Sequence, residues 1–311
     1  MQRRELLRRS AALGLAAALP AALPFAAVSK LAAGSASTSA AAQNPLKPPA
    51  KGTIPVAFLI SDDAVIIDFC GPWEVFENVG VHGRMESAFR LYTVAEMARP
   101  IRAGGGMKII PDYTLATAPA PAVIVIPAQS EPSEAVLEWV RNSTQTTDVT
   151  MSVCTGAFLL AKTGLLSGRS ATTHHSAYMQ FAMDFPDILL KRGARFVEDG
   201  NLASAGGLTS GIDLALRVVE RYFGRQVAKQ TADQLEYQGQ GWLNPESNQM
   251  YAERRISTAQ HPLCPVCEMD VDPGTAPKST YRGKTYYFCA QSHKTLFEAA
   301  PDRILEAMKT S

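Results

Sequence analysis

The chain has 311 residues, and its 30 basic and 29 acidic side chains leave a net charge close to zero. This length is enough for one sizeable α/β domain plus a smaller one, since domains commonly contain roughly 100–200 residues. The sequence has no dense basic face or long charged run that would follow a phosphate backbone. We therefore expect no nucleic acid among its partners.

Residues 1–42 are typical of an export signal peptide. A basic head precedes an alanine-rich apolar stretch at 11–27 that two prolines interrupt, and small residues at 40–42 suit a cleavage region. A bilayer span needs about 20 apolar residues, which this stretch does not supply. Arg3-Arg4 resembles a twin-arginine signal, which directs folded proteins to the periplasm. The alternatives are an ordinary secretory signal and a retained amphipathic anchor.

The segment 53–250, between short linkers at 43–52 and 251–260, predicts one α/β domain. Continuous apolar runs, typical of strands covered on both faces, lie at 54–60, 89–95 and 121–127. Segments with helical periodicity lie at 71–80, 133–142 and 211–224. This alternation predicts a doubly wound, mostly parallel sheet with helices on both faces.

Cys154 follows a strand-like run at 148–153 and precedes a helical pattern at 156–166. The small-x-Cys-x-Gly spacing is that of a nucleophile elbow. A thiol at a helix N-terminus is expected to have a lowered pKa, and the N–H groups of Thr155 and Gly156 would face a developing anion. The alternative is a buried, unreactive cysteine.

Asp68 and His174 are candidate partners of this thiol. Asp68 ends an apolar run before Gly71-Pro72, where a carboxyl could act as general acid or base. The alternative for Asp68 is an N-cap of a helix at 71–78. His174 or His175 could exchange a proton with a cysteine, or the two could be a surface pair.

These residues are similar to a known superfamily. The motifs "DFCGPWEVF", "SVCTGAFLLAKTGLLSGRSATTHH" and "ASAGGLTSGIDLALRVVERYFG" resemble the ThiJ/PfpI superfamily, a branch of the class I glutamine amidotransferase-like fold. Within it, the chain resembles the isonitrile hydratase-like group and the related halves of AraC-type regulators. The resemblance covers about 53–250 and implies a flavodoxin-like sandwich, a small-molecule substrate and a homodimer.

For a hydratase of this group, the resemblance implies that water adds across R–N≡C to give an N-substituted formamide. Cys154 would attack the terminal carbon, Asp68 would protonate it and later activate water, and Thr155 would help to hold the thioimidate. His174 would lie near the site, and the catalytic domain would need no cofactor. The substrate would lie against Gly71, Ala128, Gln129 and Gly156.

One departure concerns the end of the third strand. The superfamily usually has Pro-Gly-Gly there, whereas this chain has Pro127-Ala128-Gln129. Positive backbone dihedrals are less favourable without glycine, and the Gln129 side chain could occupy the anion pocket. The departure bears on the substrate and leaves the thiol and carboxyl in place.

Residues 261–311 predict a small metal-binding module. Cys264-x-x-Cys267 offers two thiolates from one turn, and Cys289-x-x-x-His293 offers a thiolate and an imidazole at a strand-to-helix corner. Four such ligands suit zinc, and the sulfurs also suit copper. The alternative is a Cys264–Cys267 disulfide.

The same module resembles a YHS domain in its Cys-Pro-Val-Cys opening and its "YYFC" strand. That resemblance implies a metal ion held by Cys264, Cys267, Cys289 and the residue in the last position. Glu268 stands where glycine is usual, and His293 where cysteine is common.

Three hypotheses follow. The first is an exported cysteine-dependent hydratase or hydrolase with a metal-binding appendage. The second is a periplasmic metal-handling or redox-sensing protein whose reactive cysteine does not turn over. The third is a partner-binding module with an inaccessible Cys154.

Overall fold

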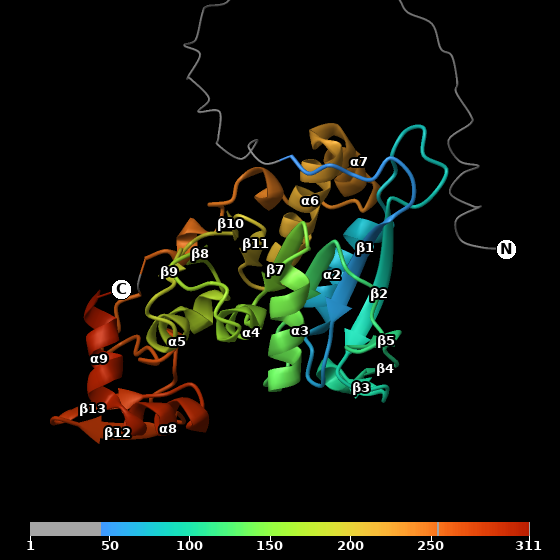
Figure 1. The fold of residues 1–311 in the computed structure, drawn as a ribbon. Helices are drawn as coiled ribbons and strands as arrows, with labels where there is room; N and C mark the ends of the chain where they lie inside the picture. The colour runs from blue at the N-terminus through green and yellow to red at the C-terminus, as the bar shows by residue number, and fades with distance from the viewer. Residues whose placement is uncertain (1–44, 254, 311) are drawn as a thin grey trace, which may run out of the picture. The chain divides into compact units, whose positions relative to one another are not determined.

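The computed structural model describes residues 45–253 and 255–310, so the predicted signal peptide lies outside the described residues. Its largest element is a seven-stranded sheet in the order β10-β11-β7-β6-β1-β2-β5 (Figure 1). The strands of this sheet are β1 (Ile54–Leu59), β2 (Phe89–Ala95), β5 (Tyr113–Thr114), β6 (Val123–Ile126), β7 (Val149–Val153), β10 (Phe196–Asp199) and β11 (Leu202–Ala205). Every pairing in it is parallel except that of β10 with β11. The predicted fold class is confirmed.

The central strand β1 shows why the apolar runs are continuous. Val56 and Phe58 pack with one hydrophobic cluster, while Ala57 and Leu59 pack with a second one on the opposite face. Successive side chains of a strand point to opposite faces, so a strand with apolar cover on both sides needs apolar residues at every position.

Helices cover both faces of this sheet (Figure 1). One cluster includes residues of α2 (Ile66–Glu77), α6 (Ser210–Phe223) and α7 (Arg225–Gln234). The other includes residues of α3 (Glu134–Thr144), α4 (Gly156–Lys162) and α5 (Tyr178–Asp184). The short pairs β3 (Ile101–Arg102) with β4 (Lys108–Ile109) and β8 (Ser170–Ala171) with β9 (Leu189–Leu190) lie outside the main sheet.

The start of α2 differs from the sequence prediction. The helix begins at Ile66, so Asp68 lies in its first turn and is neither a loop residue nor the N-cap, which is Val65. Pro72, expected at the helix start, lies inside the helix, where it cannot donate an N–H to the Asp68 carbonyl. Packing against α6 accompanies this arrangement, since a Cβ on Gly71 would lie 2.9 Å from Ile212 Cγ1.

The C-terminal module combines an antiparallel hairpin with two helices. Strands β12 (Lys278–Tyr281) and β13 (Lys284–Tyr287) pair with each other, and α8 (Gln291–Ala299) and α9 (Pro301–Thr310) follow. The two helices are separate, with Pro301 at the first position of α9, where its missing N–H costs nothing. Among the described residues, none of the helices has both the length and the apolar character to cross a membrane.

Candidate functional site

Cys154 lies at a sharp turn between β7 and α4. Its φ is +58°, a left-handed conformation that non-glycine residues adopt rarely. Its N–H donates to the Gly206 carbonyl at 2.8 Å and to Ala205 O at 3.2 Å, and Thr173 Oγ1 donates to the Cys154 carbonyl at 3.0 Å. The side chain is buried, with the residue 7% exposed. This is the backbone geometry of a nucleophile elbow.

Gly156 allows the elbow to approach the neighbouring strand. A Cβ at this position would lie 2.3 Å from Ile126 O and 2.7 Å from Pro127 O, closer than real contacts permit. The absence of a side chain therefore lets α4 begin directly against the end of β6. The role of Gly156 in the structure is close packing of α4 against β6.

Asp68 and Cys154 lie together in the interior. Asp68 is fully buried, its Oδ2 accepts a hydrogen bond from the Ala128 N–H at 3.1 Å, and the Cys154 thiol also interacts with the carboxyl. Burial raises the pKa of Asp68 to about 6, against the lowering effect of both hydrogen bonds. The second oxygen, Oδ1, is buried without a hydrogen-bond partner among the described residues. A buried acceptor without a partner is uncommon, and it is suited to a proton from substrate or thiol.

The expectation of a lowered cysteine pKa is wrong. Burial, followed by the nearby charge of Asp68, raises the pKa of Cys154 to about 11. Hydrogen bonds from the Thr155 and Leu208 N–H groups and from the Thr155 side chain act in the opposite direction, and they do not compensate. The thiol therefore carries its proton at neutral pH, and Asp68 is the group placed to accept it.

His174 lies near the elbow, and among the described residues it makes no hydrogen bond to the thiol. Its Nδ1 contacts Ser176 Oγ at 2.8 Å, and burial lowers its pKa to about 4, so the ring is neutral at pH 7. The ring packs on Gly207, where a Cβ would lie 2.4 Å from His174 Cδ2. His175 is exposed and stacks on Tyr251 at 4.1 Å between ring centroids.

The Pro127-Ala128-Gln129 segment is arranged differently from an open anion pocket. The Ala128 N–H already donates to Asp68, and Gln129 Nε2 donates to the Leu59 carbonyl at 3.1 Å. The Gln129 side chain is therefore tied to the end of β1. Gly71, the remaining expected substrate contact, faces Ile212 of α6.

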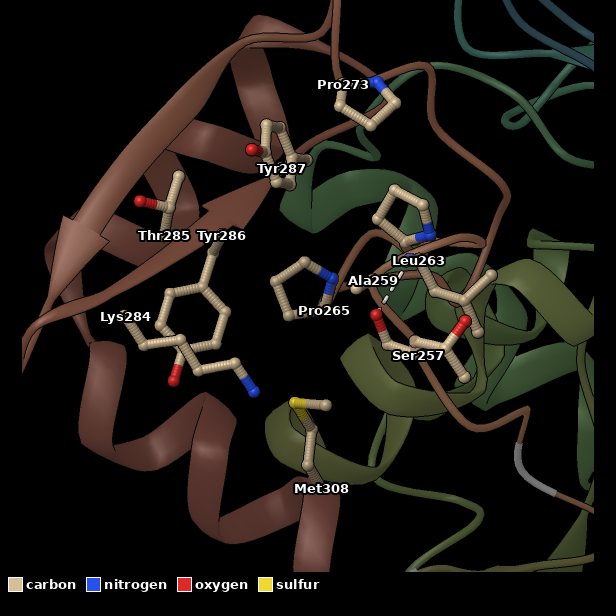
Figure 2. A pocket seen from close by; sticks show the side chains of 12 residues that line it. Ser257, Ala259, Leu263, Pro265, Pro273, Lys284, Thr285, Tyr286, Tyr287 and Met308 are labelled. Carbon is tan, nitrogen blue, oxygen red and sulfur yellow. Dashed lines mark hydrogen bonds between the residues drawn. The ribbon is translucent and has the colours of Figure 1, made fainter.

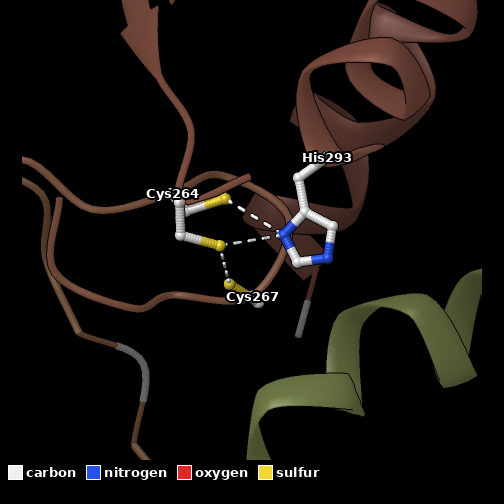
Figure 3. Close-up of side chains that lie close together, drawn as sticks. Cys264, Cys267 and His293 are labelled. Carbon is white, nitrogen blue, oxygen red and sulfur yellow. Dashed lines mark hydrogen bonds between the residues drawn. The ribbon is translucent and has the colours of Figure 1, made fainter. Parts of the chain in front are cut away.

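The cysteines and histidine of the C-terminal module form one cluster. The donor atoms of Cys264, Cys267, Cys289 and His293 all lie within 4.8 Å of one another. His293 Nδ1 lies 3.6 Å from Cys264 Sγ and 3.2 Å from Cys289 Sγ, and Cys267 Sγ lies 3.4 Å from Cys289 Sγ (Figure 3). With metal–ligand distances of about 2.0–2.3 Å, a tetrahedral site has edges of roughly 3.3–3.8 Å. These three separations are close to the edges of a tetrahedral site, so the donor set suits a tetrahedral ion, which would join the Cys264–Cys267 turn to the Cys289–His293 corner.

The turn that carries Cys264 and Cys267 ends at Glu268, where glycine is usual. The Glu268 N–H donates to the Cys264 carbonyl at 2.8 Å, and its φ is +60°, which explains why glycine is usual here. Its carboxylate pairs with Arg192 Nη2 at 3.1 Å. The hydrogen bond between Cys264 and Cys267 lowers the pKa of Cys264 and raises that of Cys267, so one thiolate is favoured even without an ion.

A pocket of about 380 Å³ lies beside the hairpin of the module and was not predicted from sequence. In Figure 2, Lys284 and Tyr286 of β13 lie across it from Leu263 and Ser257. It combines segments distant in sequence, so no local pattern indicates it. Sequence reasoning also missed the Leu208 N–H that reaches the thiol, because that donor is a backbone group.

Comparison with known proteins identifies two regions. The DJ-1/PfpI family model matches residues 55–221, and the YHS domain model matches residues 264–307. Both resemblances inferred from motifs are confirmed at this level.

Individual relatives include enzymes and regulators. An isonitrile hydratase from Pseudomonas putida is 29% identical over 58% of this chain and 78% of its own length. The HTH-type transcriptional regulator CdhR from Pseudomonas aeruginosa is 29% identical over 47% of this chain, and the match spans only 45% of the regulator.

A solved structure supports the same relationship. A ThiJ/PfpI family protein from Pseudomonas syringae has a TM-score of 0.54 and 26% identity, covering 60% of this chain and 76% of that one. The family match extends over more than half of the chain and includes both Asp68 and Cys154. The chain belongs to the DJ-1/PfpI family.

Proposed function

We propose that this protein is a cysteine-dependent hydratase or hydrolase of a small molecule, with Cys154 as nucleophile and Asp68 as acid and base. The observation that carries the proposal is the buried thiol–carboxyl pair with the partnerless Asp68 Oδ1. A protonated thiol beside a carboxylate is a nucleophile with its own base. Similarity to an isonitrile hydratase supports R–N≡C as the substrate class.

The steps balance with water as the only co-reactant. Asp68 takes the Cys154 proton as the sulfur bonds to the terminal carbon, and the same proton passes to that carbon, giving a thioimidate. Asp68 then accepts a proton from water as the water oxygen bonds to the thioimidate carbon, and it passes this proton to the nitrogen. The C–S bond breaks as the new hydroxyl becomes the formamide carbonyl, and Asp68 carries the hydroxyl proton to the Cys154 sulfur.

The donors around the sulfur assist these steps. The Thr155 N–H and side chain and the Leu208 N–H stabilise negative charge on Cys154 as it develops. The neighbouring His174 ring is neutral at pH 7, which favours an uncharged substrate over an anion.

The test is formamide production from a panel of alkyl and aryl isonitriles, with amides and reactive carbonyls for comparison. The wild type is expected to turn over at least one compound, and Cys154→Ala none. Cys70→Ala is the matched control, since Cys70 is a half-buried cysteine of α2 outside the proposed chemistry. Equal turnover by wild type and Cys154→Ala, or none by the wild type, rejects the proposal.

A second candidate is a metal-handling or redox-sensing protein whose Cys154 does not turn over. The observation favouring it is the four-donor cluster of the C-terminal module, which suits zinc or copper. Metal analysis of the purified chain identifies the ion. A metal-loaded wild type without turnover of the panel supports this candidate.

We further propose that the protein is exported to the periplasm and forms a homodimer. The Arg3-Arg4 motif and the apolar stretch after it support export, and family resemblance supports the dimer. N-terminal sequencing of the protein from a periplasmic extract and its mass in solution test these two expectations.

A further inference from the structure

The loop at 206–209 is part of the environment of Cys154. The Gly206 carbonyl accepts the Cys154 N–H at 2.8 Å, and the Leu208 N–H donates to the Cys154 sulfur. Gly207 lies against the His174 ring. The loop therefore contacts the elbow through the Gly206 carbonyl, and the Leu208 backbone lowers the pKa of the thiol.

This loop has an unfavourable backbone conformation at Leu208. Its φ is +40°, and a non-glycine residue in this region costs free energy. The Leu208 side chain is 41% exposed, so its burial offers little compensation. A conformation of this kind persists when surrounding contacts determine it.

Arg195 supplies such contacts from the other side of the loop. Its carbonyl accepts the Gly206 N–H at 2.9 Å, and its Nη2 donates to Thr209 Oγ1 at 2.9 Å. These two bonds hold the residues on either side of Gly207-Leu208. The Thr209 hydroxyl makes no capping bond to α6 and instead accepts the hydrogen bond from Arg195.

Arg195 is itself fixed by a fully buried carboxylate. Its Nε donates to Asp213 Oδ2 at 2.6 Å. The same carboxylate accepts the Tyr237 hydroxyl at 3.0 Å and the Trp242 N–H at 2.8 Å. An arginine with a planar fork and a buried partner has little freedom to move.

We infer that Arg195 is a positioning residue for the nucleophile: through Thr209 and Gly206 it holds the 206–209 loop against Cys154, whose N–H the Gly206 carbonyl accepts. This role rests on the proposed function in one respect, that Cys154 is the reacting group. Arg195 contacts the loop and acts on the sulfur only through it.

The test measures carbamidomethylation of Cys154 by iodoacetamide in the full-length chain between pH 7.5 and 10, quantified on the Cys154 peptide. Only the thiolate reacts, so the rate reports how well negative charge on the sulfur is stabilised. Thr209→Val removes the hydroxyl and retains the shape of the side chain. We expect a rate about three- to tenfold below that of the wild type across this range, as for loss of one hydrogen bond to a charged group. Arg195→Lys is also expected to lower the rate.

Two further variants make the result specific. Thr209→Ser keeps the hydroxyl and is expected to restore the wild-type rate. Thr231→Val removes a hydroxyl that donates to the Val227 carbonyl at 3.0 Å on α7, away from the 206–209 loop, and is expected to leave the rate unchanged. The charged side chain that acts on the thiol, Asp68 of α2, and the His174–His175 pair are the same in all these proteins.

An unchanged or faster rate in folded Thr209→Val, or a decrease equal to that in Thr231→Val, overturns the inference. The measurement does not depend on turnover. A wild type inactive toward isonitriles rejects the proposed function, while a rate decrease in Thr209→Val that Thr209→Ser reverses still supports the positioning role.

Discussion

The Asp68 carboxyl and the Cys154 thiol are buried side by side, one in the first turn of α2 and the other at the turn after β7. Burial raises the pKa of Asp68 to about 6 and that of Cys154 to about 11. Moving the proton from sulfur to carboxylate before substrate binds would then be unfavourable by several kcal/mol. The thiolate is therefore expected to form as the sulfur attacks, and not beforehand.

Asp68→Asn is expected to separate turnover from simple thiol reactivity. Without the acid and base, isonitrile hydration should fall by about 10²–10⁴-fold. The negative charge of Asp68 raises the Cys154 pKa, so alkylation of Cys154 by iodoacetamide should become faster. Asp184→Asn, on the exposed surface of α5, is the control for both assays. Retained hydration in Asp68→Asn would contradict the role of this carboxyl.

Asp68 should also give stability a defined pH dependence. Its folded-state pKa of about 6 exceeds the unfolded value of about 3.9, so its favourable contribution is complete below pH 4 and is lost as pH rises through 6. The wild type should therefore lose up to about 3 kcal/mol relative to Asp68→Asn between pH 4 and 7.

Urea unfolding of both proteins at several pH values measures this difference. His174, whose lowered pKa destabilises the fold as pH falls toward 4, is present in both proteins and cancels. A constant difference across the pH range would show that the Asp68 pKa is not raised.

Gly156→Ala should be severely destabilising. The added Cβ would lie 2.3 Å from Ile126 O and 2.7 Å from Pro127 O, both backbone atoms that cannot move without shifting β6. We expect a loss of roughly 3 kcal/mol or more in the free energy of unfolding. Gly80→Ala, where no atom lies within 4 Å of the new Cβ, should change stability by less than about 1 kcal/mol. Similar losses in the two variants would contradict the close approach at Gly156.

Metal binding by the C-terminal module should require all four donors. We expect one zinc or copper ion per wild-type chain by elemental analysis, and strong loss of metal from Cys264→Ser, because Cys264 is one of the four donors and is fully buried. Cys70→Ser should retain the ion. A chelator should lower the thermal midpoint of the wild type by several degrees. A metal-free wild type with a Cys264–Cys267 bond by mass spectrometry would favour the disulfide alternative.

Local sequence patterns predicted several elements of the sheet domain. The apolar run at 89–95 became β2 with the same bounds, and the segment at 211–224 became α6 within one residue. Both are long and strongly patterned, because a strand buried on two faces and an amphipathic helix have distinct periodicities. The Cys-x-x-Cys and Cys-x-x-x-His spacings indicated a donor cluster because those ligands come from two short turns.

Periodicity and spacing are local properties, so the sequence was enough to predict the mostly parallel sheet, the cysteine after its β7 strand and the donor set of the C-terminal module. The position of Asp68 inside α2 and the raised pKa of Cys154 depend on how the chain folds. Burial depends on which helices cover a residue. The helix α2 continues past Pro72, where it packs closely against α6. The Arg195–Thr209 contact likewise joins segments that no local pattern relates, so the environment of the nucleophile became visible only in the folded chain.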